Sequence, residues 1–325
     1  MASTNETLFD ENRSFLWGLL YRMTGCGADA DDLLQETFVR LLERGPQQDG
    51  RPLRPWLVRV AMNLAHDLLR RRRRCPYVGP WLPSPVGGDS GEGIEALEVV
   101  ASGVSTEGRY DLLETMSMAF LVALEALTPR QRAVLLLRDV FDYSVRETAA
   151  ALGSSEGGVK VAHLRARKAM LDYDGRRPAS VSEARDQTRL ALAEFTTALL
   201  TGDLPRVQEL LTADCVAKSD GGGEFYAALN PICGASNVAR FYHGIFVKFG
   251  GCVEPRLVEV GGMPALHVVV TGRGAGRAPG VEARIARRFV LQADVDAEGR
   301  ITRLYSVLAT RKLTHVERGA SAALS

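Results

Sequence analysis

Apolar residues recur at helical spacing in the first 75 residues of the chain. In residues 29–43, DADDLLQETFVRLLE, they follow one another at steps of three and four, which places them on one face of a helix. That expected core face comprises Ala30, Leu33, Leu34, Thr37, Phe38, Leu41 and Leu42. A helix is also expected in residues 8–25, and a third from Pro55 to just before Pro76, because proline suits a first helical turn and breaks a helix interior. The pattern predicts an all-helical N-terminal domain.

The helical pattern stops over residues 76–110. The first part, YVGPWLPSP, is rich in proline and carries Tyr77 and Trp81, although flexible linkers usually contain few aromatic side chains. The remainder is rich in Gly and Ser and has five acidic residues but no basic residue before Arg109. This composition predicts a mobile acidic linker after the proline-rich segment.

A helix-turn-helix pattern follows the linker. Thr128 and Gln131 have capping-box spacing, with a proline at the first helical position between them. Ser144 and Glu147 repeat the capping box, and Gly153 is expected to end the short helix that they begin. A longer basic helix comes next. A short helix, a glycine turn and a basic helix are typical of a DNA-binding helix-turn-helix.

The pattern changes again from about residue 180. Helices are expected over residues 183–200 and 236–249, with a short helix ending near Leu211 between them. Strand-like runs occupy residues 254–260, 263–271, 281–295 and 300–310. Helices followed by a meander of strands predict an α+β domain.

Composition narrows the classes of protein that fit. A length of 325 residues favours two or three domains, and a net charge of +1 means that any nucleic-acid surface must be local. No apolar stretch approaches membrane-spanning length, so we expect a soluble, cytoplasmic protein. The scattered cysteines, without a CxxC pair, indicate reduced thiols, and the absence of clustered histidines indicates no metal or other cofactor. The cysteines are Cys26, Cys75, Cys215, Cys233 and Cys252.

The basic helix after Gly153 carries four cations outside its apolar stripe: Lys160, Arg165, Arg167 and Lys168. In a helix-turn-helix, the start of this helix reaches base edges while later basic residues hold phosphates. The alternative is a solvated basic face on a bundle helix. The capping boxes and the glycine turn in register favour DNA binding.

Two polar faces stand out in the N-terminal domain. In residues 29–43, one face carries Asp31, Asp32, Gln35 and Glu36. Acids at a helix start stabilise the helix dipole, which explains the two aspartates but not the two later residues. We therefore expect an acidic face that docks on a basic protein surface.

The third helix presents the second polar face, with Arg59, Asn63, Asp67 and Arg70 at helical spacing. Such side chains can hydrogen-bond to and stack on unpaired bases. The five arginines over residues 70–74 have two other interpretations, a solvated helix end at the negative dipole terminus or a tract that attracts phosphates without reading sequence. The tract alone does not decide between them.

In their order and spacing, DADDLLQE, the Asn63 helix and the helix-turn-helix resemble a bacterial sigma factor of the extracytoplasmic-function group, over about residues 5–173. The resemblance implies a protein that binds RNA polymerase core enzyme and promoter DNA and catalyses no reaction. The organisation it implies is sigma region 2 over residues 1–75, a linker over 76–110, sigma region 4 over 111–175 and a C-terminal domain over 180–318.

The resemblance also implies residue roles. Asp32, Gln35 and Glu36 would contact the polymerase. The residues implied in reading the minus-ten promoter element are Arg59, Asn63, Asp67 and Arg70. Those implied at the minus-thirty-five element, on bases or phosphates, are Lys160, Arg165, Arg167 and Lys168.

YVGPWLPSP resembles a signature of the sigma factors that carry a C-terminal SnoaL-like (NTF2-like) domain, where Glu is common at the position of Ser84. The second signature of that subgroup, DGGGK, matches here at Asp220, Gly221, Gly222 and Gly223, with Glu224 in place of the lysine. In the subgroup this domain regulates activity in cis and replaces a separate anti-sigma protein. We therefore expect Tyr77 and Trp81 to pack on the C-terminal domain as regulatory contacts. The alternative is that Trp81 caps the core of the first helical domain.

SnoaL-like domains are cones with an apolar cavity, and some are isomerases or cyclases. Here Asp220, His243 and His267 show no diagnostic catalytic spacing, which favours a regulatory domain with a small-molecule ligand as an open expectation. Two alternatives stay open: a one-component ligand-sensing transcription regulator, and an NTF2-like enzyme fused to a DNA-binding module.

Overall fold

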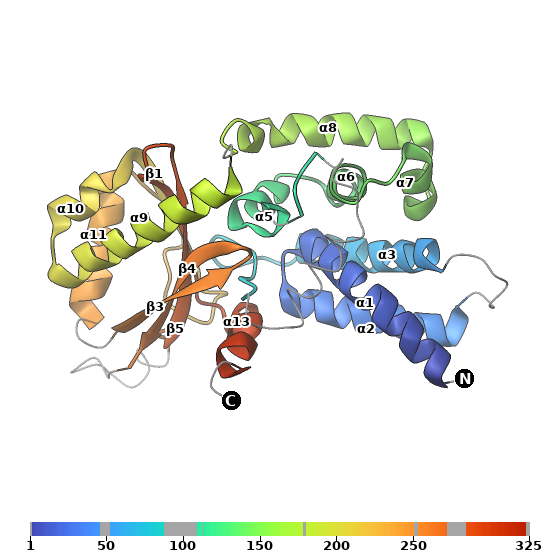
Figure 1. Ribbon diagram of the computed structural model, residues 1–325, viewed down its shortest axis with the longest axis horizontal. Coiled ribbons are helices and arrows are strands. Elements are labelled where there is room, and N and C mark those ends of the chain that lie inside the picture. The colour runs from blue at the N-terminus through green and yellow to red at the C-terminus, as the bar shows by residue number, and fades with distance from the viewer. Residues whose placement is uncertain are drawn as a thin grey trace. The chain divides into compact units, whose positions relative to one another are not determined.

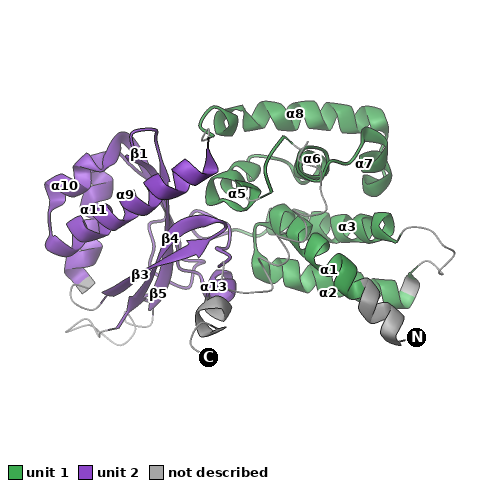
Figure 2. Cartoon of the chain, in the orientation of Figure 1, with its two compact units in different colours: residues 1–76, 89–177, 318–325 green, residues 77–88, 178–317 purple. Residues whose placement is uncertain are grey.

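The computed structural model describes residues 2–45, 53–87, 109–112, 114–177, 180–249, 253–271 and 284–322. The chain divides into two compact units, and each is described by itself (Figures 1 and 2). Unit 1 comprises residues 1–76, 89–177 and 318–325, and unit 2 comprises residues 77–88 and 178–317.

Three helices form the first half of unit 1: α1 (Ala2–Thr24), α2 (Gly27–Arg44) and α3 (Arg54–Arg72). They pack against one another in pairs, and their apolar stripes form a common core (Figure 1). Side chains with no exposed surface in this core include Leu16, Leu19, Leu20, Ala30, Leu57, Val58 and Ala61. Burial of these stripes supplies most of the stability of such helices.

Leu42 corrects the expected core face of α2. Its side chain is 66% exposed, whereas Leu33 and Leu34 are buried. Leu42 follows Gln35 by seven residues, or about two helical turns, so it lies on the same side of α2 as Gln35. The hydrophobic spacing alone therefore predicted a wider buried face for α2 than the structure has.

The second half of unit 1 is also helical. Its elements are η1 (Glu114–Met116), α5 (Met118–Leu124), α6 (Pro129–Leu135), η2 (Leu136–Val140), α7 (Val145–Leu152) and α8 (Glu156–Asp174). Both expected capping boxes form: Thr128 and Gln131 at α6, and Ser144 and Glu147 at α7, each exchange side-chain and backbone hydrogen bonds. Gly153 ends α7 in the left-handed region, with φ +58°, as its place in the turn requires. The expected helix-turn-helix therefore forms from α7 and α8.

The two halves of unit 1 are joined by buried arginines. Arg22 of α1 donates to Thr115 Oγ1 at 2.7 Å and to the Leu112 carbonyl at 2.9 Å. Arg132 of α6 donates to the Met23 carbonyl at 2.8 Å. Burial lowers the pKa of Arg22 to about 10, so the guanidinium stays charged at neutral pH and needs these acceptors. The joint between the halves is therefore partly polar.

Unit 2 is an α+β domain. Its helices are α9 (Val181–Thr201), α10 (Leu204–Glu209), α11 (Ala235–Phe249) and the start of α13 (Thr310–Ala322). Its strands are β1 (Leu211–Asp220), β2 (Ile232–Cys233), β3 (Val253–Val260), β4 (Met263–Val270), β5 (Arg288–Val295) and β6 (Ile301–Val307). Among the described residues they form one sheet in the order β2-β1-β6-β5-β4-β3, in which β1 and β6 run parallel and the other neighbours antiparallel. α9 and α11 pack on this sheet (Figure 1).

Several elements of unit 2 differ from expectation. Strands β1 and β2 and helix α13 were not predicted, and the run expected as a strand over 300–310 ends as β6 at Val307. The run expected from residue 281 begins as β5 at Arg288, and residues 281–283 lie outside the described residues. β1 mixes buried and exposed positions irregularly, so it lacks the period-two signal, and its long partner β6 lies far along the chain.

The proline-rich segment, residues 77–88, belongs to unit 2. Leu82 and Val86 are buried there, with 0% and 3% of their surface exposed. The Gly261 N–H donates to the Val86 carbonyl at 2.9 Å, beside an antiparallel bridge between Gly87 and Val260. The segment is therefore an integral part of unit 2. The acidic stretch expected to be a mobile linker, residues 88–108, lies outside the described residues.

Candidate functional site

The outer face of α2 combines acidic, amide and apolar side chains. Asp32 and Gln35 are exposed, and Glu36 is half-buried and paired with Arg40 at 2.9 Å. Asp31, in contrast, accepts a hydrogen bond from Trp17 Nε1 at 2.7 Å and so supports the packing of α1 on α2.

Two apolar residues on this face had no place in the expected site. Val39 and Leu42 are 45% and 66% exposed. They lie seven residues, about two turns, beyond Asp32 and Gln35 respectively, so the four side chains form one stripe. Exposed apolar residues beside polar ones are typical of a protein-docking surface.

The polar face of α3 is presented as the sequence indicates. Arg59, Asn63, Asp67 and Arg70 are all exposed, at steps of three and four residues. The opposite side of α3 is buried in unit 1 through residues that include Leu57, Ala61 and Leu64. Two further arginines of the tract have contacts within unit 1: Arg72 donates to the Thr24 carbonyl at 2.8 Å and Arg73 to the Leu127 carbonyl at 2.6 Å.

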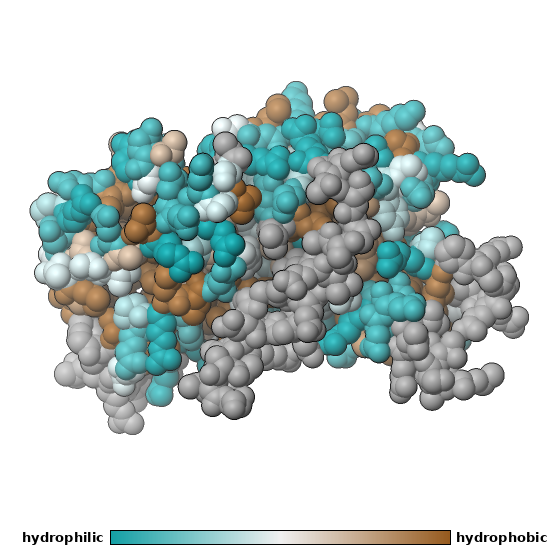
Figure 3. All heavy atoms as spheres, in the orientation of Figure 1, coloured by the Kyte–Doolittle hydropathy of each residue, from teal (hydrophilic) through white to brown (hydrophobic). Residues whose placement is uncertain are grey.

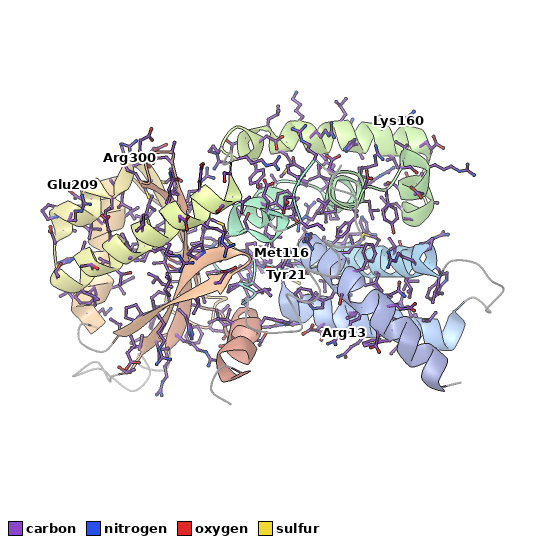
Figure 4. The ribbon with its side chains drawn as sticks, in the orientation of Figure 1. Arg13, Tyr21, Met116, Lys160, Glu209 and Arg300 are labelled. Carbon is purple, nitrogen blue, oxygen red and sulfur yellow. The ribbon has the colours of Figure 1, made fainter. Side chains whose placement is uncertain are left out.

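Helix α8 carries the expected basic surface (Figure 4 labels Lys160 near the end of α8 that meets α7). Lys160, Arg165 and Lys168 are exposed and form no ion pair with any residue in the described part of the chain. Their charges are therefore available to an external anion.

Arg167 differs from these three. Its Nε and Nη2 donate to the two carboxylate oxygens of Asp139 at 3.1 and 3.0 Å, and His163 Nε2 lies 2.8 Å from Asp139 Oδ1. Burial raises the pKa of Asp139, but the hydrogen bonds from His163 and Arg167 outweigh it and hold the pKa below its ordinary value. Arg167 thus fixes α8 to η2, a structural role that the sequence analysis did not assign.

Apolar side chains also interrupt the basic surface of α8. Val161, Leu164 and Leu171 are 50%, 72% and 62% exposed. Figure 3 shows hydrophobic residues among hydrophilic ones along this helix. The surface of α8 is therefore a mixture of basic and apolar side chains rather than purely cationic.

In unit 2, the carboxylate of Asp220 binds the proline-rich segment through hydrogen bonds. This carboxylate is 0% exposed and accepts hydrogen bonds from the Tyr77 hydroxyl at 2.6 Å and the Leu82 N–H at 2.7 Å. It also accepts from Lys312 Nζ at 2.6 Å and from the Gly222 N–H at 3.0 Å. We call this set, Asp220 with Tyr77, Leu82 and Lys312, the clasp. A buried carboxylate with this many donors is well satisfied.

Lys312 completes the clasp from α13. Its Nζ also donates to the Leu82 carbonyl, and it lies 4.0 Å from the Trp81 ring centroid and 5.1 Å from that of Tyr77. A cation within about 6 Å of an aromatic face is attracted to it. No local pattern signals the role of Lys312, because it lies 92 residues beyond Asp220 in a helix that was not predicted.

The glycines after Asp220 are required by close approach. A Cβ on Gly221 would lie 2.6 Å from the Phe225 carbonyl oxygen, and one on Gly222 would lie 2.8 Å from the Ala309 Cβ. Gly222 also has φ +61°, which disfavours other residues. Gly223 lies beside Val78, so all three glycines let the turn meet its neighbours.

Glu224, where the subgroup signature has lysine, has a local partner. Its Oε2 accepts from the N–H of Thr310, at 3.4 Å, where α13 begins. A negatively charged side chain stabilises a helix N-terminus, because it lies at the positive end of the helix dipole. The cation of the clasp is that of Lys312 and not one at position 224. Ser84, where Glu is common in the subgroup, lies in the proline-rich segment and is buried, with 2% of its surface exposed.

The described residues do not assemble a catalytic group. Unit 2 encloses a cavity between α9, α11 and the sheet. His243 of α11, His267 of β4 and Asp220 do not line it. Within the described part of the chain, no cluster of three His, Cys, Asp or Glu side chains could hold a metal ion. Over the same residues, no helix is both long and apolar enough to cross a bilayer.

Comparison with known proteins gives consistent matches. The family model "Sigma-70 region 2" matches residues 8–75, and "Sigma-70, region 4" matches residues 117–170. The "ECF RNA polymerase sigma factor SigJ" of Mycobacterium tuberculosis is 30% identical over 309 residues, which cover 94% of this chain and 92% of that protein. SigG of the same organism is 36% identical over 217 residues, covering 60% of this chain and 56% of SigG. The crystal structure of M. tuberculosis SigJ superposes with a TM-score of 0.71 at 28% identity, covering 95% of this chain and 98% of SigJ.

Proposed function

Because the chain belongs to the extracytoplasmic-function (ECF) sigma factors of RNA polymerase, we propose that it loads the core enzyme onto promoters through three exposed surfaces of unit 1 and is regulated by the clasp of unit 2. The family directs polymerase to promoter DNA and is not enzymatic. The expected fold class is confirmed: helical sigma region 2 and region 4, then an α+β SnoaL-like (NTF2-like) domain. The region 2 match also covers the segments that a one-component regulator or an enzyme fusion leaves unexplained.

The polymerase would dock on the outer stripe of α2. Asp32 and Gln35 provide polar contacts, with Glu36 at the edge, and Val39 and Leu42 add apolar area that water leaves on docking. This extends the site implied by the resemblance by two residues.

The observation that carries the DNA-binding proposal is the exposed polar stripe of α3. Arg59, Asn63, Asp67 and Arg70 face away from the core of unit 1 with their hydrogen-bonding groups available at helical spacing. An unpaired base offers both a stacking face and donor and acceptor edges to such side chains. We assign this stripe to the minus-ten element.

At the minus-thirty-five element, the surface of α8 would enter the major groove. We assign Lys160, near the helix start, to contacts with base edges, and Arg165 and Lys168 to contacts with phosphates. Arg167 is the weakest of the four expected contacts, because Asp139 holds its guanidinium.

Regulation in cis would act through the clasp. The segment that Asp220 and Lys312 hold follows α3 directly in the chain, so its docking or release changes the tether between regions 2 and 4. With a regulatory domain in the same chain, we propose that no separate anti-sigma protein is needed, that the protein works in the cytoplasm with polymerase, and that unit 2 responds to a small-molecule ligand.

Run-off transcription with bacterial core polymerase tests the function. We expect initiation at a cognate promoter only when the full-length protein is added. The double variant Arg59→Ala/Asn63→Ala should lose initiation while still co-eluting with core polymerase on a sizing column. Arg189→Ala, an exposed cation on α9, is the matched control and should behave as wild type.

Two results would contradict the proposal. Unchanged initiation in the presence of the protein would reject the sigma-factor role of this chain. Equal transcription by the double variant and the control would remove the minus-ten assignment. For regulation, removing residues from about 180 onward and Trp81→Ala should change output in the same direction.

A further inference from the structure

Unit 2 contains a cavity of about 580 Å³. Small-molecule sites in proteins have volumes of about 300–1,000 Å³, so this cavity is of suitable size. Its walls are mostly apolar and come from α9, α11 and the sheet, through residues that include Phe195, Leu199, Phe241, Ile245, Val268 and Phe289. Such walls favour a ligand with a largely apolar body.

Three polar side chains that line the cavity, those of Thr196, Tyr242 and Ser306, are hydrogen-bonded within unit 2. The Tyr242 hydroxyl lies 2.9 Å from Ser306 Oγ, and burial raises the pKa of Tyr242 above its ordinary value, so it stays protonated. None of the described residues that line the cavity is a histidine or an acid. The cavity is therefore equipped to hold a molecule, not to transform it.

One cation lines this apolar cavity. Lys248, in the last turn of α11, is the single charged residue among the described lining residues. It is exposed and forms no ion pair with any residue that the structure describes. A charge at the rim of an apolar cavity matches a ligand with an apolar tail and an anionic head.

We propose that unit 2 binds an apolar monocarboxylate, of the fatty-acid type, with its hydrocarbon body in the cavity and its carboxylate at Lys248. The ligand would lie against the elements that form the clasp. Ser219 lines the cavity next to Asp220, and Leu308, also in the wall, donates its N–H to the Asp220 carbonyl at 2.8 Å. Occupancy would thus act on the residue that holds the proline-rich segment.

The proposal deepens the regulatory role proposed for unit 2, and its use in the cell rests on that role. Binding is tested directly on the full-length protein, without polymerase, by titration with the fluorescent fatty acid cis-parinaric acid. We expect saturable, single-site binding that dodecanoic acid displaces more strongly than dodecanol. Failure to bind would overturn this inference and leave the sigma-factor assignment intact.

Variants of the cavity distinguish binding of the hydrocarbon body from binding of the carboxylate. Thr196→Phe, on α9 in the cavity wall, should abolish binding of both acid and alcohol by filling the cavity, and Leu199→Trp should do the same. Lys248→Met should weaken binding of dodecanoic acid by about two- to fivefold, which is the contribution of an exposed ion pair. Binding of dodecanol should not change. Lys248→Arg should restore the acid, and Arg240→Met, a cation on α11 outside the cavity, is the control.

Folding of each variant is checked by circular dichroism and thermal unfolding before titration. Non-saturable binding, or binding that both cavity-filling variants leave unchanged, would place the probe on the surface and overturn the proposal. Equal displacement by the acid and the alcohol, with no effect of Lys248→Met, would overturn the carboxylate assignment.

Discussion

Lys312 of α13 lies over the Trp81 ring, with its Nζ 4.0 Å from the ring centroid, while the same ammonium forms an ion pair with buried Asp220. One side chain therefore joins an aromatic anchor, a buried acid and the backbone of the proline-rich segment. Loss of this ammonium should weaken all three attachments together.

Removing the ammonium should destabilise unit 2 strongly. Lys312→Met leaves Asp220 buried without its counter-charge, which costs about 3–5 kcal/mol in comparable buried pairs. Urea unfolding followed by circular dichroism measures the loss. Arg185→Met, which breaks the exposed pair with Glu259, should cost less than about 1 kcal/mol. Equal losses of unfolding free energy in the two variants would show that the buried pair stabilises unit 2 no more than an exposed pair does.

Tyr77→Phe should loosen the segment without unfolding unit 2. It removes a hydrogen bond to a charged acceptor, worth about 1.5–3 kcal/mol. The Leu82 N–H donates to the same carboxylate, so its hydrogen exchange reports segment opening and should accelerate by at least about tenfold. Tyr226→Phe, an exposed tyrosine of unit 2, is the control. Unchanged exchange at Leu82 would mean that Tyr77 does not hold the segment.

Unit 1 should lose stability in acid through Asp139. Its pKa is lowered in the folded state, so its contribution is fully present above the ordinary aspartate value of 3.8 and is lost as pH falls through the lower folded pKa. Thermal unfolding between about pH 6 and pH 2.5 should show this loss. Asp139→Asn should reduce the slope in the acid range. A parallel pH profile for wild type and variant would exclude Asp139 as the source.

Leu42→Asp should weaken core-polymerase binding while leaving the fold intact. The side chain is 66% exposed, so the change costs little stability, but a charge in the apolar part of a docking surface must be desolvated. We expect about a tenfold or greater loss of affinity, at the roughly 1–3 kcal/mol cost of an unsatisfied polar group. Biolayer interferometry with core polymerase measures the affinity. Glu43→Ala, next to it and also exposed, is the control, and equal affinities would remove Leu42 from the interface.

Unit 1 should open when it engages a promoter. The minus-ten and minus-thirty-five elements lie about 25 base pairs apart, or about 85 Å of duplex at roughly 3.4 Å per base pair. In the free chain α3 packs directly against α7, and Arg22 and Arg132 join the two halves. Fluorophores at exposed Arg71 and Arg146 should show high energy transfer in the free protein and low transfer with polymerase and promoter. High transfer in the full complex would contradict opening.

Local signals in the sequence were sufficient where local chemistry sets the structure. The capping boxes at Thr128 and Ser144 and the turn at Gly153 lie within a few residues of the groups they satisfy, so the helix-turn-helix could be predicted. The polar stripe of α3 was visible for the same reason. The exposure of Leu42 was not, because a periodic pattern does not say which neighbours cover a helix.

Long-range pairing explains what the sequence did not reveal. β1 is completed by parallel pairing with β6, in which Leu211 lies opposite Ile301. The two charged members of the clasp, Asp220 and Lys312, are likewise 92 residues apart. Contacts at such separations leave no periodic trace in either segment, so neither β1 nor the cation of the clasp could be predicted from local pattern.

The proline-rich segment also has a consequence for how the protein is made. Residues 77–88 leave the ribosome long before the rest of unit 2, and the last donor of the clasp, Lys312, follows Leu82 by 230 residues. At a synthesis rate of about 5–20 residues per second, Lys312 is added about 10–50 s after Leu82. Region 4 is complete only after Asp174, the last residue of α8, which leaves 138 residues before Lys312. Each newly synthesised molecule therefore passes through a period of about 7–28 s in which regions 2 and 4 are complete but the clasp is not.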